Sequence, residues 1–585
     1  MWTYGEFDPV IKSCLIVLAL LVAIKCGPRR IGLVRRAKRG FRRIAAKPWC
    51  FSLVIIAVCF ALNGLMTSIF YPQPRVHDEF AYLLASDTFA SGRLTNERHP
   101  MQEHFETFHV LSDPSYMAKY PPANGLVLAL GQRLTGHPLV GVWISFTLAC
   151  LAFYWMLRSW TSAQWAAVGG LLLAANGPLI RAWGQTYWGG SIALMGGALI
   201  SGGLHRIWNA HHKTNMKPKT SDAILLGLGL ITLANSRPME GLFVALPVIA
   251  ALLIWYVREQ EVSWTYKTFR IAAPIVSIGI VGLALMGTYN KAVTGDMTKM
   301  PYAVHDTAYS ASSLALWKTP PEIPSYTHPR MRRFYLEFGR ERQLEMRTPA
   351  VYTRQLLRKL RLLWNYLPIG IGLSLIPAFF LWKDPWWRMS LCIVGSLLLV
   401  HTQLAASWIY PHYIAPALAL FFAINVQCLR HLRIWQRQLN WGPVLTRTFL
   451  VLAFLKLAPT IIIWTAAPLH TPRAEIENRL VSESENGGSP QHLVICSYGD
   501  DYPIVSDWVY NAADIDASQI VWARDMGESK NAKLIEYYAG RKVWRCCFEN
   551  DESMTLRVLE QADTRTTSKP NNQIEKVLAT SQVAE

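Results

Sequence analysis

The feature that most constrains this chain is a series of apolar stretches, each close to the roughly 20 residues that a helix needs to cross the hydrocarbon core of a bilayer. Of the 585 residues, 51% are apolar and 17% are charged, which is unusual for a soluble chain. The sequence therefore predicts a polytopic α-helical membrane protein with about twelve transmembrane helices. The windows lie near residues 9–26, 50–71, 138–157, 163–181, 186–204, 221–236, 239–257, 270–289, 362–382, 387–406, 411–428 and 447–466. A further apolar stretch at 123–134 is too short to span and is expected to be interfacial or re-entrant.

The distribution of basic residues predicts the orientation of these helices. A run of arginines and lysines between residues 29 and 47 follows the first window, and short cytoplasmic loops hold such residues in excess. Counting alternately from this loop places residues 72–137, residues 291–361 and the chain after 466 on the outer, periplasmic side of the plasma (inner) membrane. Topology and contact with anionic headgroups account for much of the net charge of +19, so no nucleic acid is implied.

Adjacent carboxylates stand directly after the second window, in the run Arg75-Val76-His77-Asp78-Glu79-Phe80. A carboxylate can act as a general base toward an attacking hydroxyl, and we take Asp78 as the candidate base. Glu79 is a second catalytic candidate, which could position Asp78, contact an acceptor or serve a metal if one is used. The alternative is that both acids only open a surface helix, where the helix dipole favours them by about 0.3–1 kcal/mol.

Three cationic or polar positions are candidates for binding a phosphate on the same side of the membrane. Lys119 precedes Tyr120-Pro121-Pro122, Arg237 stands three residues before Glu240, and His412 opens a late window. Cationic donors stabilise a phosphate leaving group whose charge grows as its bond breaks. The alternatives are a snorkelling lysine, a local Arg237–Glu240 ion pair and an aromatic interfacial belt around His412.

These motifs, in this order, resemble the GT-C glycosyltransferases, in particular the protein O-mannosyltransferase and aminoarabinose-transferase branch. The resemblance runs over residues 50–430 and rests on His77-Asp78-Glu79, Lys119-Tyr120-Pro121-Pro122, Asn235-Ser236-Arg237-Pro238-Met239-Glu240 and Pro411-His412-Tyr413-Ile414-Ala415-Pro416. It implies a GT-C-like catalytic domain over residues 1–466 that transfers a sugar, with inversion, from a polyprenyl-phosphate carrier at the non-cytoplasmic face.

In that family the acidic residue of the first outer loop is the presumed base, which corresponds to Asp78, and the lysine beside the proline pair, Lys119, contacts the donor phosphate. The implied partners are a polyprenyl-phosphate-linked sugar, membrane lipids, and a glycan, lipid or protein as the unidentified acceptor. No cofactor and no metal ligands are predicted, although a divalent metal is compatible with the chemistry. The substrate-pocket candidates are His77, Tyr120, Glu240, Tyr302 and Tyr413.

The chain after 466 has a different pattern. Strands are expected at 492–497, 519–523 and 542–546 and a helix at 530–538, which predicts a small α/β domain over residues 467–560. Residues 561–585 are rich in Thr, Ser, Asn and Gln and are expected to be disordered. Whether Cys496 pairs with Cys546 or with Cys547 in an oxidising compartment stays open.

Two other functions fit a polytopic chain: a transporter or flippase for lipid-linked saccharides, and a non-catalytic membrane scaffold whose tail binds a partner. A carrier would concentrate polar features near mid-membrane, often in two related halves. Here the polar material gathers on one face, which favours a site at the outer membrane surface.

Overall fold

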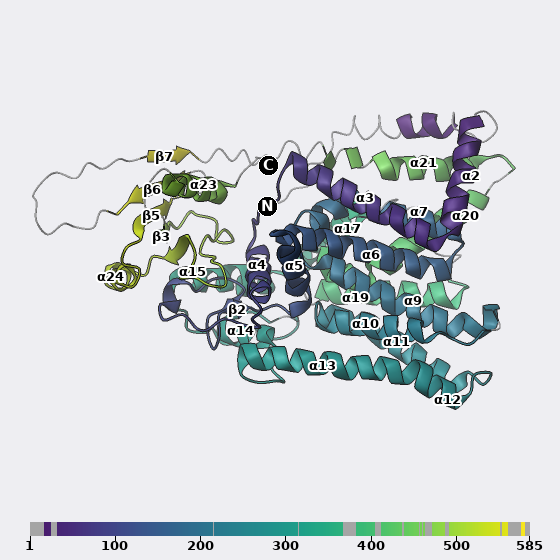
Figure 1. Cartoon of the computed structure of the whole chain (residues 1–585), viewed down its shortest axis with the longest axis horizontal. Coiled ribbons are helices and arrows are strands. Elements are labelled where there is room, and N and C mark those ends of the chain that lie inside the picture. Colours follow the sequence, from purple (N-terminus) through teal and green to yellow (C-terminus); the bar gives the residue numbers. More distant parts are fainter. Residues whose placement is uncertain are drawn as a thin grey trace, which may run out of the picture.

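The computed structural model describes residues 17–24, 32–214, 216–313, 315–366, 382–403, 411–435, 438–455, 457–458, 460–461, 471–485, 491–549, 553–559 and 575–578. It consists of a helical bundle, a middle layer built from the two predicted outer segments, and a small sheet at the far end (Figure 1). The described bundle elements are α2 (Gly32–Ala46), α3 (Pro48–Ile69), α6 (Pro138–Trp160), α7 (Ala163–Ala174), α8 (Gly177–Leu179), the π-helix η2 (Ile180–Gly184), α9 (Gly190–Thr214), α10 (Thr220–Ala234), α11 (Pro238–Arg258), α12 (Trp264–Tyr266), the π-helix η3 (Lys267–Ala272), α13 (Ala273–Thr294), α19 (Pro385–Gln403), η5 (Pro411–Ile414), α20 (Ala415–Ile434) and α21 (Trp441–Leu455).

Five described helices are long and apolar enough to cross a bilayer, and a sixth span results if the bent pair of α7 with α8 and η2 counts as one. The expected number of about twelve is therefore not confirmed for the described part of the chain. The windows near 9–26, 362–382, 387–406 and 447–466 lie partly outside the described residues. The five spans are Pro48–Ile69, Pro138–Trp160, Pro238–Arg258, Trp264–Thr294 and His412–Ile434.

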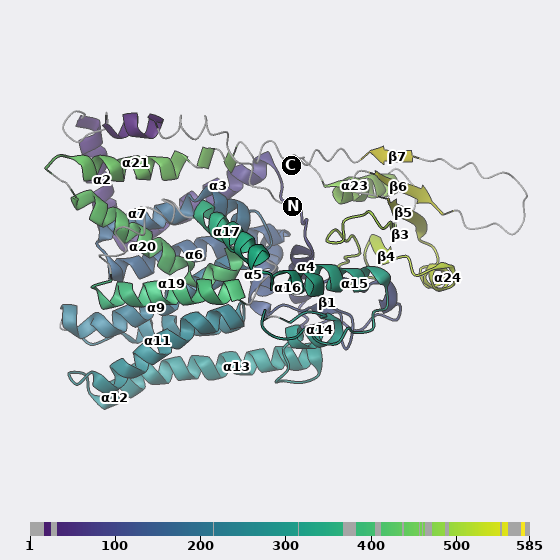
Figure 2. The same cartoon turned by 180° about the vertical axis from the view of Figure 1, so that it is seen from behind.

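Burial separates central helices from peripheral ones. The apolar window of the His412–Ile434 helix is 89% buried inside the protein, whereas that of Trp264–Thr294 is 17% buried. An apolar helix that protein does not cover is suited to contact lipid. The bundle core therefore includes α20, whereas α13 forms an outer edge, which is visible from both sides (Figure 1 and Figure 2).

The two segments predicted to be outer loops lie together at one end of the bundle, between it and the sheet (Figure 1). The first forms α4 (His77–Ala90), η1 (Gln102–His104), the short antiparallel strands β1 (Val110–Leu111) and β2 (Met117–Ala118), and α5 (Pro122–Thr135). With 14 residues, α5 is too short to span. The second forms α14 (Pro301–Tyr309), α15 (Pro329–Arg333), the π-helix η4 (Phe334–Glu341), α16 (Arg342–Glu345) and α17 (Pro349–Tyr366).

The C-terminal unit is a five-stranded sheet of order β4-β3-β5-β6-β7, in which β3 is parallel to β4 and β5 while β6 and β7 are antiparallel. Its predicted strands and helix are confirmed to within two residues at each end. Its elements are α23 (Pro472–Glu485), β3 (His492–Tyr498), β4 (Ile520–Arg524), α24 (Glu528–Tyr537), β5 (Lys542–Phe548), β6 (Ser553–Val558) and β7 (Glu575–Leu578).

Two expectations for this unit need revision. Strand β7 falls inside residues 561–585, where disorder was expected, and it is ordered by pairing with β6. The remaining residues of that segment lie outside the described part of the chain. Cys496 and Cys546 are opposite each other on β3 and β5, yet Cys496, Cys546 and Cys547 are all free thiols. The structure therefore contains neither of the two candidate disulfides.

Candidate functional site

The N-terminus of α4 places the two adjacent carboxylates in different surroundings. Val76 is extended and the helix begins at His77, so Asp78 and Glu79 occupy its first turn. Glu79 is buried: its Oε2 accepts hydrogen bonds from the backbone N–H of Arg75 (2.9 Å) and Val76 (3.4 Å), and its Oε1 accepts one from Tyr187 N–H (3.2 Å). Both oxygens of Glu79 are thus engaged with backbone, which favours a structural task. Its catalytic role stays a prediction.

Asp78 faces the interior of the middle layer. The Tyr120 hydroxyl donates a hydrogen bond to Asp78 Oδ1, and Nε2 of the buried His77 lies 3.5 Å from Asp78 Oδ2. The Asp78 side chain keeps 24% of its surface exposed. This carboxylate is therefore held by two neighbours and still accessible, as a general base has to be.

His109 completes this group, and no sequence motif pointed to it. Its backbone has φ of 64°, in the left-handed region that disfavours any residue with a Cβ. Its ring centroid lies 4.4 Å from that of His77. Burial, together with the nearby Lys119, holds the pKa of His109 well below its ordinary value, so the ring is neutral at pH 7.

One nitrogen from each histidine and one oxygen of Asp78 all lie within 4.8 Å of one another. Two neutral imidazoles and a carboxylate form a donor set that suits Zn²⁺ and related transition metals. Among the described residues, His77, Asp78 and His109 are thus the group that could hold a metal. The sequence indicated no metal but was compatible with a divalent one, and metal dependence stays open.

The predicted phosphate-binding lysine is buried beside aromatic rings. Lys119 is 5% exposed, and its Nζ lies 4.6 Å from the ring centroid of Tyr302 and 5.8 Å from that of Tyr120. Burial lowers the pKa of Lys119, while Asp306 and Asp78 act in the opposite direction. A cation held by ring faces is attracted to them and retains donors for an anion.

Arg237 lies at the start of α11 and forms a second cationic point. Its Nη1 is 3.6 Å from Glu240 Oε1, and its guanidinium lies 5.2 Å from the ring centroid of Tyr413. Tyr82 connects this point to Asp78: its ring stacks on Tyr120 at 4.5 Å. Burial raises the pKa of Tyr82 to about 12, with Arg237 lowering it and Asp78 and Glu240 raising it.

His412 lies in η5 beside Tyr413, the residue whose ring Arg237 contacts. It is 4% exposed, and its ring neighbours are Trp188, with centroids 5.3 Å apart, and Tyr413, at 4.7 Å. Its proposed phosphate contact therefore stays a prediction. The structure brings Asp78, His77, Tyr120, Lys119 and Tyr302 into one cluster and the Arg237 group next to it.

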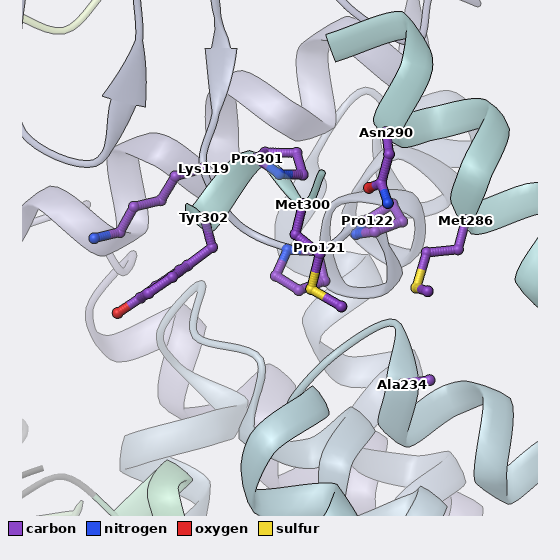
Figure 3. A pocket seen from close by; sticks show the side chains of 9 residues that line it. All are labelled: Lys119, Pro121, Pro122, Ala234, Met286, Asn290, Met300, Pro301 and Tyr302. Carbon is purple, nitrogen blue, oxygen red and sulfur yellow. The ribbon is translucent and has the colours of Figure 1, made fainter. Parts of the chain in front are cut away.

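A small, shallow pocket lies beside Lys119 (Figure 3). Lys119 and Tyr302 lie side by side at one end, and Met286 and Asn290 of α13 lie at the other. Apolar side chains dominate between them. The ammonium group of Lys119 and the hydroxyl group of Tyr302 point away from this apolar surface (Figure 3). Its lining residues are Lys119, Pro121, Pro122, Ala234, Met286, Asn290, Met300, Pro301 and Tyr302.

Comparison with known proteins gives structural matches only. No family model and no curated protein sequence matches this chain. Among solved structures, ArnT from Cupriavidus metallidurans in the apo state is 12% identical, with 86% of this chain and 93% of that chain covered and a TM-score of 0.48. The same protein bound to undecaprenyl phosphate is 14% identical, with 85% and 92% covered and a TM-score of 0.46.

The oligosaccharyltransferase of Archaeoglobus fulgidus in complex with Zn and sulfate is also similar, at 11% identity, with 84% of this chain and 67% of that chain covered and a TM-score of 0.42. ArnT and this oligosaccharyltransferase are GT-C superfamily members.

Proposed function

We propose that this protein is an inverting GT-C-type glycosyltransferase that moves a sugar from a polyprenyl-phosphate carrier to an acceptor hydroxyl or amine at the non-cytoplasmic membrane face. The observation that carries the proposal is that the accessible Asp78 carboxylate lies close to two cations. Tyr120 contacts both Asp78 and Lys119, and Tyr82, which stacks on Tyr120, lies near Arg237. A base and cationic donors for a phosphate are the two requirements of this chemistry.

The proposed reaction is a single displacement. The acceptor oxygen or nitrogen attacks the anomeric carbon, Asp78 takes the proton that the acceptor loses, and the bond to the carrier phosphate breaks with inversion. Lys119, and Arg237 beside it, would stabilise the charge that grows on the leaving phosphate. The apolar surface next to Lys119 would contact the first part of the carrier chain.

The same geometry suggests a role for each of the other predicted residues. Glu79 holds the start of α4, His77 and Tyr120 orient Asp78, and Glu240 orients Arg237. Tyr302 and Tyr413 line the two cations. The proposed step uses no metal, because these side chains already supply the base and the positive charge. Transfer that continues in EDTA is the result expected.

Asp78→Asn in the purified full-length protein tests the proposal. The variant preserves shape but removes the base, so we expect transfer from a radiolabelled polyprenyl-phosphate sugar to fall by about 10²–10⁴-fold. Binding of polyprenyl phosphate should stay within about threefold of the wild type, since the lysine and arginine are untouched. Asp113→Asn, at an exposed position of the same outer segment, is the matched control.

Normal turnover by Asp78→Asn would exclude this residue as the base. Movement of lipid-linked sugar between leaflets without cleavage of the sugar bond would instead assign a carrier. If substitutions at Asp78 and Lys119 have no effect on the function of the protein, whereas deletion of the tail abolishes it, the protein is a scaffold.

A further inference from the structure

A fully buried ion pair connects the C-terminal unit to the first outer segment. Arg524 Nη2, at the end of β4, donates to Asp507 Oδ2 at 2.6 Å, and neither side chain has any exposed surface (0% for both). The same guanidinium donates to the carbonyl oxygen of Glu106 from Nε (3.2 Å) and from Nη2 (2.9 Å). One side chain of the tail therefore holds the backbone of a distant loop.

Other contacts fasten the same loop, residues 104–109, to the ion pair. Nδ1 of the buried His104 lies 2.9 Å from the carbonyl oxygen of Arg524. The Thr107 hydroxyl donates to Asp507 Oδ2 at 3.3 Å. Both members of the pair thus bind the segment, through its backbone and through its side chains.

The far end of this segment contacts the candidate site. Phe108 is fully buried and stacks on Phe334 of η4, with centroids 3.9 Å apart. His109 follows it, and its ring packs against His77, whose Nε2 faces Asp78. The left-handed backbone at His109 needs support from its surroundings, because a residue with a Cβ is strained in that conformation.

The loop that carries Asp507 reaches the site by a second route. The backbone of Val505, two residues before Asp507, lies close to the imidazole of His77. The tail therefore approaches the ring beside Asp78 at Val505 and is also connected to it through residues 104–109.

Stability alone is a weak explanation for such a pair. Burying two charges is costly, and well-packed apolar residues of similar volume often do as well or better. The pair instead fixes the relative orientation of the tail and the first outer segment, since charge-assisted hydrogen bonds are directional.

We propose that Arg524 and Asp507 are positioning residues of the transferase site: they hold residues 104–109 so that His109 keeps the ring of His77 against Asp78. This inference rests on the proposed function. It makes the C-terminal unit a structural part of the site and not an appended module.

The test removes both charges together in the full-length protein, as Arg524→Met with Asp507→Leu, so that neither member of the pair is left buried without the other. Hydrogen exchange of the peptide covering residues 104–109 should become about tenfold faster or more, because its fastening is lost. The kcat for sugar transfer should fall by about 10²-fold, as expected for a misplacement near 1 Å, while the KM for the lipid donor stays within about threefold.

Two further variants separate positioning from folding. Arg524→Lys keeps a positive charge opposite Asp507 but loses the two-nitrogen contact with the Glu106 carbonyl oxygen, so an intermediate fall in kcat is expected even if the double variant does not fold. Leu480→Ala opens a cavity in the fully buried core of the tail around α23, away from residues 104–109. It should lower Tm and leave kcat and the exchange of residues 104–109 unchanged.

Unchanged exchange in the double variant, unchanged kcat in both variants that alter Arg524, or an equal loss of kcat in Leu480→Ala would each overturn the inference. A wild-type protein that transfers no sugar from any polyprenyl donor would refute the proposed function instead. The exchange comparison would then still decide whether the pair fastens this segment.

Discussion

At the scale of residues, the adjacent carboxylates Asp78 and Glu79 have different surroundings. Consecutive side chains on a helix point about 100° apart, so Asp78 and Glu79 cannot face the same partner. Glu79 points back to the backbone N–H groups of Arg75, Val76 and Tyr187, whereas Asp78 points to Tyr120 and His77. The sequence placed both carboxylates at one helix start, and their packing distinguishes the candidate base from the anchor.

The first residue prediction concerns Lys119. Lys119→Met keeps the apolar stem and removes the ammonium group, so we expect kcat/KM for the lipid donor to fall by about 10²–10³-fold, the loss typical of one charge-stabilising donor. Steady-state kinetics with a polyprenyl-phosphate sugar measures it. Lys299→Met, at a 66% exposed lysine of the second outer segment, should have no effect. Equal kinetics for Lys119→Met and wild type would remove the lysine from the site.

The second concerns the pH dependence of stability. Burial raises the pKa of Glu79 from 4.5 to about 7. Because the folded state holds this proton more tightly than the unfolded chain, its contribution to the free energy of unfolding is full below pH 4.5. The contribution is lost as pH rises to about 7, with a slope of at most about 1.4 kcal/mol per pH unit.

Glu79→Gln should flatten the unfolding free energy of the protein in that pH window relative to wild type. Denaturation of both proteins at a series of pH values between 4 and 8 measures the difference. Parallel curves would show that Glu79 does not titrate in this range.

At the scale of elements, one close helix contact sets the position of the candidate site. A Cβ on Gly131 of α5 would lie 2.1 Å from the backbone nitrogen of Gly141 in α6, and a Cβ on Gly141 would lie 2.2 Å from the carbonyl oxygen of Val127. Only glycine allows the two backbones to approach so closely. Because α5 follows directly after Lys119-Tyr120-Pro121, this contact fixes where that motif stands relative to the bundle.

We therefore expect Gly141→Ala to destabilise the protein by about 1–3 kcal/mol, as overpacking does. Gly279→Ala in α13 is the matched control, because its added Cβ would meet nothing within 4 Å. It should be neutral or stabilising by up to about 1 kcal/mol, since alanine favours a helix. The thermal midpoints of the two variants in detergent measure the contrast, and equal midpoints would contradict the role given to the α5–α6 contact.

At the scale of the whole molecule, the two outer segments and the tail lie at the same end of the bundle, while the turn between α11 and α12 lies at the other end (Figure 1). Contacts between the tail and the first outer segment, such as that of Arg524 with Glu106, hold this end together. One end of the molecule is therefore polar and assembled from three separate parts of the chain. Such an arrangement requires all three parts to be on the same side of a membrane.

The corresponding prediction is one of sidedness. Single cysteines at the exposed positions Lys299 and Lys530, in a background without native cysteines, should react with a membrane-impermeant maleimide from the outer side of sealed cells. A cysteine at Arg258, at the end of α11, should react only after permeabilisation. Labelling of Arg258→Cys alone in sealed cells would invert the proposed orientation.

Much of the architecture could be predicted because its signals are local. An apolar run of 20 residues forms a helix wherever it is placed in hydrocarbon, and short alternating stretches form strands, so the spans α3, α6, α11 and α13 and the strands β3 to β5 were predictable. The sequence placed Asp78, Tyr120 and Lys119 in one outer segment, but their clustering depends on how that segment packs. The short helices and the pairing of β7 with β6 were not predictable, since they depend on packing partners far along the chain.

What the sequence by itself determined is a membrane-embedded helical chain whose polar segments, with their carboxylates and cations, lie on one side. Only the tertiary structure decided that His109 stands beside Asp78 in a left-handed conformation, that Glu79 is an anchor for backbone, and that Arg524 of the tail holds the loop next to the candidate site. Hydrophobic pattern is a property of neighbouring residues, whereas these contacts join residues up to several hundred positions apart and exist only once the bundle, the outer segments and the sheet have packed together.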